Sequence, residues 1–382
     1  MNKKIFLPLM ATLLLFSCGE TVPSSEEKKE ISLETGFNVL EKGLKNIDSF
    51  DKVGLSLDID TFKFHTYSSN VSEVTNEETS ETVETYECKK TKIELEDFSF
   101  DVGVGGLTTA TKFEEMEASF LVEGDISFSS TDSSDETQNV SFNYEALAAA
   151  AYLNQGKLYL DGSNSNFARF LNEMMGSEVP SEQLKIYMDA EVDEEVTFPL
   201  LNENAIDNTL TDEELNAALE VYKNLDLSKY GDAFKMYQQG NDYFFEFNIT
   251  PQALALLMID IEILNSEEGI QLPTSEQIQQ MVTQSITLFQ KMGIEKMNFV
   301  LGFSENGLNS LSGDVKVAPR ISDVNPDYEK YGLVDGDTLF ELDFSIDFIY
   351  GSEVKIAKPE SFEGYIKVEE NQSNNSTSEI QA

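Results

Sequence analysis

The chain has 382 residues, one His and two Cys, and its 26 Lys and Arg against 70 Asp and Glu give a formal net charge of −44. So negative a chain repels phosphate, which argues against a nucleic-acid partner and against adsorption to anionic headgroups through a basic patch. One His excludes a His-rich metal site, and two Cys cannot build a disulfide framework. Apolar residues make up 40% of the chain, which is enough for a large core.

The chain begins with a pattern typical of an export signal. Lys3 and Lys4 precede an apolar run over residues 5–16. This run is too short for a membrane-spanning helix, which needs about 20 residues, but it has the length of the apolar segment of a signal peptide. The sequence therefore predicts an exported protein.

The apolar run ends in Leu15-Phe16-Ser17-Cys18-Gly19, which resembles the lipobox of bacterial lipoproteins. The resemblance implies that Cys18 is acylated, becomes the new N-terminus and holds the protein on the outer side of the cell membrane. The alternative is an ordinary secretory signal with an incidental Cys. We expect a signal peptide over 1–17, an acidic flexible tether over 18–30, a folded domain over 31–367 and a disordered tail over 368–382.

The first half of the folded domain combines one helix with strands. Apolar residues spaced by four and three predict a helix over 33–47. Alternation predicts strands over 53–59, 98–104 and 116–122, and a change of register at Phe62 and Phe64 predicts a bulge. The polar stretches 68–85 and 129–139 are expected to form long loops or ragged hairpins, and a hairpin is expected around 154–156.

The middle of the chain is predicted to be mostly helical. Helices are expected over 166–175, after a capping box at 211–214, over 253–264 with Thr250-Pro251 opening it, and over 274–292 with Gly293 as its end. The helix over 253–264 is apolar nearly all round, so it should be buried on most sides. A hairpin is expected to turn at residues 239–241.

The last third returns to strands, over 297–303 and, with six apolar positions in strict alternation, over 340–350. Strands of this kind form an antiparallel sheet with one wet face. The other face must be covered, and the apolar helices are expected to cover it. The fold class expected is therefore α+β.

Three segments together are similar to the LolA/LppX-like lipoproteins: residues 46–50 after the first helix, the 156–159 hairpin and Lys358-Pro359-Glu360. That resemblance implies a curved, unclosed β-barrel around helices, with an apolar cavity that holds a lipid-like ligand. The expected lining residues come from the closing strands and from the helix over 253–264, and each of them has plain core packing as its alternative. They are Phe299, Leu301, Phe344, Phe348, Leu254 and Leu257.

Other candidate site residues point to no chemistry. Cys88 is interpreted as a spare thiol on a strand, and His65 as a strand residue that faces solvent. The run Asp323-x-Asn325-x-Asp327 begins like a calcium loop but lacks the Gly and the final Glu that an EF-hand needs. Residues 335–337 are interpreted as a turn.

We therefore expect no enzyme, no cofactor and no bound metal. The preferred hypothesis is a membrane-anchored lipoprotein that binds or carries an apolar, lipid-like ligand. The alternative is a non-enzymatic surface display or adhesion lipoprotein, with a filled core and an acidic exterior that contacts a cationic partner. The sequence names neither the ligand nor a protein partner.

Overall fold

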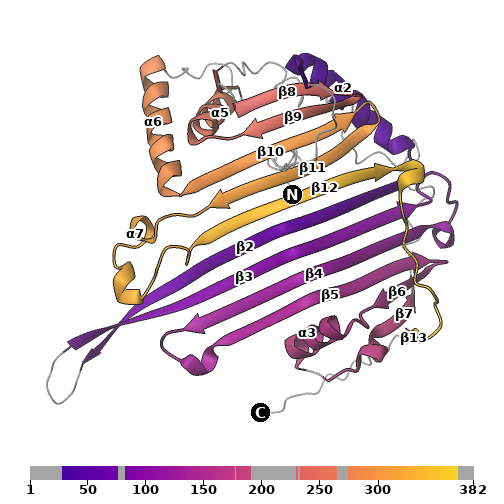
Figure 1. Cartoon of the computed structure of the whole chain (residues 1–382), viewed down its shortest axis with the longest axis horizontal. Coiled ribbons are helices and arrows are strands. Elements are labelled where there is room, and N and C mark those ends of the chain that lie inside the picture. The colour runs from indigo at the N-terminus through magenta and orange to yellow at the C-terminus, as the bar shows by residue number, and fades with distance from the viewer. Residues whose placement is uncertain are drawn as a thin grey trace, which may run out of the picture.

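The computed structural model describes residues 28–75, 82–176, 178–190, 229–230, 233–264 and 274–368. The predicted signal peptide, Cys18, the capping box at 211–214 and the tail beyond residue 368 lie outside these residues. The described part forms one large sheet with a few helices, so the α+β class is confirmed (Figure 1).

The sheet has thirteen strands in the described residues. Their bounds are β1 Lys29–Glu30, β2 Lys52–Thr75, β3 Thr82–Gly105, β4 Glu117–Asp132, β5 Val140–Asn154, β6 Lys157–Asp161, β7 Lys185–Asp189, β8 Phe234–Gln239, β9 Asp242–Asn248, β10 Ile294–Ser304, β11 Gly307–Val317, β12 Leu339–Tyr350 and β13 Ile366–Lys367.

The strand order is β1-β8-β9-β10-β11-β12-β2-β3-β4-β5-β6-β7-β13. Every neighbouring pair is antiparallel except β13 and β7. Because β1 and β13 end the order without pairing with each other, the sheet is not closed. β1 also corrects one expectation, since the last two residues of the predicted tether pair with Tyr237 and Gln238 of β8.

The helices begin and end where local chemistry requires it. The longer ones are α2 Leu33–Asn46, α3 Ser165–Met175, α5 Pro251–Leu264 and α6 Ser275–Lys291, as predicted within one or two residues. Ser32 caps α2, and Thr274 and Gln277 form a capping box at the start of α6. Gly176, in the left-handed conformation, ends α3. The short helix α7 covers Ile321–Val324.

The main core lies where α2 and α5 pack on one face of β8–β11. Buried side chains of the two helices, such as Phe37, Leu40 and Leu257, meet Phe247 and Phe303 of the sheet. α5 is buried on most sides, as its composition predicts, although Met258 is exposed. This end of the molecule is therefore a sheet covered by helices.

In the described residues, the polar stretch 68–85 belongs mostly to paired strands, and 129–139 ends β4 and connects it to β5. β2 and β3 stay paired from Lys52 and Gly105 out to Thr75 and Thr82, which forms a two-stranded ribbon beyond the sheet (Figure 1). The predicted bulge is confirmed, because the pairing of β12 with β2 shifts by one residue at Asp60.

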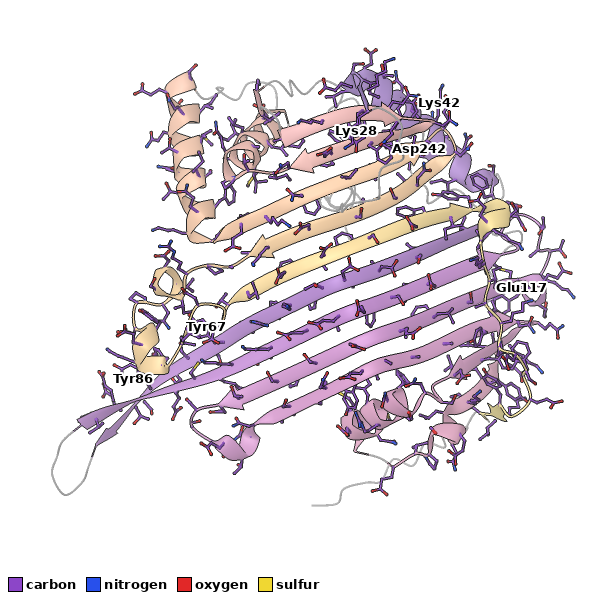
Figure 2. All side chains as sticks on the ribbon, in the orientation of Figure 1. Lys28, Lys42, Tyr67, Tyr86, Glu117 and Asp242 are labelled. Atoms are coloured by element: carbon purple, nitrogen blue, oxygen red, sulfur yellow. The ribbon has the colours of Figure 1, made fainter. Side chains whose placement is uncertain are left out.

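The chain after β12 crosses the ends of the central strands. The Ala357 N–H donates to Ser119 Oγ at 2.9 Å, and Lys358 pairs with Glu117 (Figure 2). Gly103 permits this crossing, because a Cβ there would lie 2.7 Å from the Lys355 carbonyl oxygen. Tyr365 then donates to Asp161 and leads the chain into β13.

Candidate functional site

One face of the sheet is apolar across its whole width, because the strand register brings apolar residues into line. Residues in direct cross-strand pairing share a face. One such row crosses β11, β12, β2, β3, β4 and β5 through Leu311, Ile346, Leu57, Phe100, Val122 and Ala149. A second row is Phe340, Phe64, Ile93, Phe128 and Phe142. We call this side the apolar face and the opposite side the polar face.

The described helices cover only the two ends of the apolar face. α2 and α5 pack at β8–β11 and α3 packs on β5, while none lies across β12, β2, β3 and β4 (Figure 1). The sheet is about 58 Å wide at 4.8 Å per strand. The longest of these helices, α6, measures only about 26 Å. The described helices therefore cover the ends of this face and not its centre, while the helix predicted after residues 211–214 lies outside the described residues.

The central apolar side chains are accordingly half-buried or exposed in the described structure. Phe64 and Phe120 keep 40% and 42% of their surface accessible. Two pairs of rings are in contact on this face: Phe100 meets Phe120 edge to face at 4.3 Å, and Phe128 stacks on Phe142 at 5.1 Å. We call the phenylalanines that β2–β5 carry in this open part of the apolar face the aromatic patch: Phe62, Phe64, Phe100, Phe120, Phe128 and Phe142.

A line of irregularities crosses the central strands at one height. β2 and β3 leave Asp60 and Asp97 unpaired, and the registers of β3 with β4 and of β4 with β5 shift beside Gly124. Asp97, Gly124 and Ala146 all have positive φ. The Asp125 carboxylate accepts the Ala146 N–H at 2.7 Å and holds this conformation. Because bulges bend strands and increase their twist, aligned bulges bend the sheet along one line.

The six predicted lining residues do not gather at the open part of the face. Phe299, Leu301 and Leu257 are buried in the main core, and Leu254 and Phe348 pack partly buried against it. Phe344 is buried on β12, opposite Ile59. The open part belongs to β2–β5, and sequence reasoning did not name its residues. Their alternation was visible, but the part of the sheet that helices cover was not.

The polar face carries a second contact region, made by the segment 321–337. Ile321 and Leu333 pack on Cys88, which is 3% exposed, with Tyr67 at the margin (Figure 2). Lys90 pairs with Asp337 at 2.6 Å. Burial by itself raises the pKa of Asp337. Hydrogen bonds from Lys90 and the Val334 N–H lower that pKa by more than burial raises it, so the pKa of Asp337 lies below its usual value. Burial also raises the pKa of the Cys88 thiol, which makes it less reactive.

His65 lies under this segment, so the prediction that it faces solvent is wrong. It is 8% exposed, with Nδ1 2.9 Å from the Gly336 carbonyl oxygen and Nε2 2.7 Å from Glu94 Oε1. Its alternation was read correctly, since it is on the polar face, but a turn 271 residues away folds over it. Glu94 also accepts a hydrogen bond from the Ser127 hydroxyl at 3.5 Å. The two bonds of His65 therefore join the segment 321–337 to β3.

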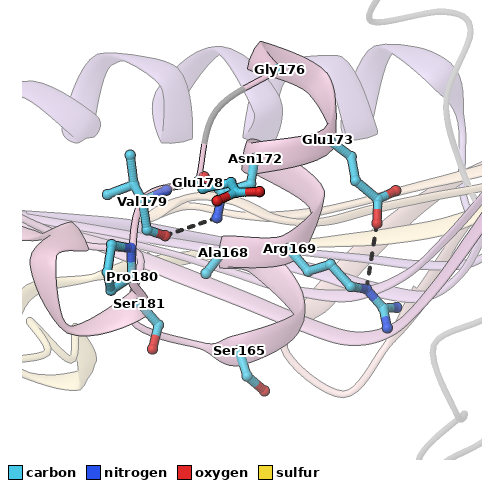
Figure 3. A pocket seen from close by; sticks show the side chains of 10 residues that line it. All are labelled: Ser165, Ala168, Arg169, Asn172, Glu173, Gly176, Glu178, Val179, Pro180 and Ser181. Carbon is cyan, nitrogen blue, oxygen red and sulfur yellow. Dashed lines mark hydrogen bonds and ion pairs between the residues drawn. The ribbon is translucent and has the colours of Figure 1, made fainter.

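An open hollow of about 700 Å³ lies beside α3 (Figure 3). Its side chains bind each other: Asn172 bonds both the N–H and the carbonyl of Val179, and Arg169 pairs with Glu173. The Tyr144 hydroxyl donates to Glu173. Burial is the larger cause that raises the pKa of Tyr144, and this hydrogen bond is the second. The lining is mixed and polar: Ser165, Ala168, Arg169, Asn172, Glu173, Gly176, Glu178, Val179, Pro180 and Ser181.

The calcium-like run is used internally. Asn325 Oδ1 accepts the Asp327 N–H, and Asp327 pairs with Lys330. In the described part of the chain, no three His, Cys, Asp or Glu side chains are grouped so that they could hold a metal ion.

Within the described ranges, no helix combines the length and the apolar character that crossing a membrane requires. No family model matches the chain, and no curated protein matches it. The geometry of the two faces is therefore the basis for a functional conclusion.

Proposed function

We propose that the protein is a membrane-anchored extracytoplasmic lipoprotein whose aromatic patch binds the acyl chain of a lipid-like ligand. The observation that carries the proposal is the open apolar face of β2–β5, where Phe64 and Phe120 stay exposed although apolar residues flank them on every neighbouring strand. Soluble proteins rarely expose large apolar surfaces, and where they do, the surface is often a binding site.

The chemistry of the patch suits a hydrocarbon chain. Its rings offer apolar surface with hardly any polar group, so binding depends on burial rather than on directed hydrogen bonds. Burying ten methylene groups contributes about 8 kcal/mol at 0.8 kcal/mol each. After the loss of translational and conformational freedom, this magnitude suits reversible rather than permanent binding. A carrier needs such reversibility.

The architecture supports a LolA/LppX-like interpretation. An unclosed, mostly antiparallel sheet has helices packed at both ends of its apolar face, and a line of bulges crosses its centre. An apolar face that is open between two helix-covered ends can hold a chain along it. The predicted lining residues Phe344 and Phe348 border the patch through Ile59 and Leu55 of β2, so part of the predicted site adjoins it.

The anchor is a separate element of the proposal. An acylated Cys18 would keep the protein at the membrane, because two or more acyl chains give stable anchoring. Palmitate labelling tests this directly: the parent chain is expected to take up label, and Cys18→Ala is expected to lose it. Label in Cys18→Ala would contradict the assignment.

Ligand binding is tested on the acyl-free chain made with Cys18→Ser. Native mass spectrometry is expected to show co-purifying lipid, or binding of added palmitic acid with one-to-one stoichiometry. A chain that stays ligand-free in several preparations and binds no added fatty acid or phospholipid would refute lipid carriage. That result would favour the alternative of a surface display protein with an acidic exterior.

A further inference from the structure

Most of helix α6 is uncharged although the chain as a whole is strongly acidic. A quarter of all residues are charged, yet residues 277–290 contain no Asp, Glu, Lys or Arg. The polar side of the helix consists of Gln, Thr and Ser instead. A surface without carboxylates is the part of a −44 chain that an anionic membrane repels least.

The apolar side of α6 is wider than the surface it buries. At 100° per residue, the apolar positions from Leu288 round to Ile286 cover an arc of about 160°. Phe289, near the middle of this arc, is buried, and α6 packs on α5. Leu288 and Met292, one turn apart on one flank, are 56% and 44% exposed. This flank is therefore apolar and uncovered in the described structure.

The neighbouring helix adds to the same corner. α5 follows the end of β9, and α6 leads directly into the start of β10, which pairs with that end of β9 (Figure 1). The exposed Met258 belongs to α5. Both helices thus lie at one end of these strands, near the edge of the sheet that β1 forms.

The predicted anchor can reach this corner. β1 pairs with β8, and Cys18 lies ten residues before Lys28. Lys29 pairs with Gln238 near the end of β8, whereas the start of β8 lies beside the end of β9, where α5 begins. The tether must therefore run back along β8, whose six residues span about 20 Å, and ten residues extend at most about 36 Å. The tether is therefore long enough for the α5–α6 end to meet the bilayer that holds the acyl chains.

We infer that the exposed flank of α6, formed by Leu288 and Met292, lies in the headgroup region of the membrane and orients the protein on it. This inference rests on the proposed lipid anchor and adds a second, weaker contact. An uncharged amphipathic helix can bury its apolar side in the interface without crossing the bilayer. The contact would be insensitive to salt, because no charge takes part in it.

The test places a polarity-sensitive fluorophore on Leu288→Cys and, as a matched control, on Gln290→Cys. Gln290 is exposed, at the same end of α6 and about 200° round the helix from Leu288. Cys88 is buried, so the unsubstituted chain serves as the blank for labelling. The acylated full chain is reconstituted in vesicles of phosphatidylcholine and phosphatidylglycerol, and the acyl-free Cys18→Ser chain is added to the same vesicles at high lipid concentration.

We expect the emission of the fluorophore at position 288 to rise at least threefold when vesicles are added and to be quenched by spin-labelled lipid. This emission should change little between 50 and 500 mM salt. The emission at position 290 should change less than 1.5-fold on adding vesicles. Leu288→Glu with Met292→Glu should weaken vesicle binding of the acyl-free chain about tenfold. Equal responses at both positions in both preparations would overturn the inference. A rise at 288 without vesicles would overturn it too and indicate self-association. Failure of the anchor alone shows separately, as loss of vesicle flotation by the full chain.

Discussion

Phe98 crosses directly over Gly124: a Cβ at position 124 would lie 2.5 Å from the Phe98 Cα and 2.9 Å from its Cβ. Gly124 also has a φ of 150°, in the region that favours glycine. This contact lies on the line of bulges that crosses the apolar face. The close approach of β3 to β4 at this point therefore depends on the absence of a side chain at position 124.

Gly124→Ala should destabilise the protein by about 2–4 kcal/mol, because it combines overpacking with a strained backbone. Urea unfolding measures the loss. Gly176→Ala is the control, since Gly176 has a φ of 62° but nothing within 4 Å of the added Cβ. The control should lose only about 1 kcal/mol. Equal losses would show that the contact with Phe98 has no energetic weight.

Phe120→Ser should weaken fatty-acid binding about tenfold and lower stability by less than about 1.5 kcal/mol, because the ring is only partly buried in the ligand-free protein. Titration followed by native mass spectrometry gives the affinity. Leu121→Ser is the matched control, since the next residue on the strand projects from the polar face. Parallel losses of affinity in both variants would argue against the aromatic patch as the site.

The pair of Lys90 and Asp337 gives stability a defined pH dependence. Because the folded-state pKa of Asp337 lies below its unfolded value of about 3.9, its contribution is present above that pH and is lost as the pH falls through the folded-state pKa. Asp337→Asn should therefore cost about 1–3 kcal/mol at pH 7 and progressively less below pH 4.

Urea unfolding at pH 7 and at pH 3 checks the Asp337 prediction. Glu117→Gln, which breaks the exposed pair with Lys358, is the control and should cost less than about 1 kcal/mol. A difference between Asp337→Asn and the parent that stays constant with pH would show that the ionised carboxylate is not what stabilises this contact.

His65→Ala should release the segment 321–337, because the imidazole bonds both Gly336 of this segment and Glu94 of β3. Hydrogen exchange is expected to speed up about tenfold in residues 321–337 and to stay unchanged in β9 and β10 of the main core. Lys63→Ala, two residues earlier on the same face, should leave both regions unchanged. Faster exchange throughout the sheet would mean that His65 supports the whole fold instead.

Local patterns in the sequence predicted the elements well, because strand alternation and helix caps are determined by near neighbours. The strand over 340–350, the capping box of α6 and the bulge at Asp60 all appear as expected. The hairpin extensions of β2 and β3 were ambiguous, since Ser, Thr and Glu fit a paired ribbon in water as well as a loop.

The site was harder to predict, because it depends on long-range packing. The burial of His65 requires a turn 271 residues away. Phe299 and Phe100 have the same alternation, yet one is in the helix-covered core and the other on the open face. A single strand carries no information on which part of a thirteen-stranded sheet its helices reach.

The central claim is that an acyl chain lies on the aromatic patch, and photo-crosslinking tests it most directly. The acyl-free chain is irradiated with a diazirine-bearing palmitic acid, and the adducts are mapped by peptide mass spectrometry. We predict adducts on the apolar-face residues of β2–β5, above all Phe64, Phe100 and Phe120, that excess unlabelled palmitic acid removes. Adducts confined to the α3 hollow or to the α5–α6 corner, or none that competition removes, would contradict the claim.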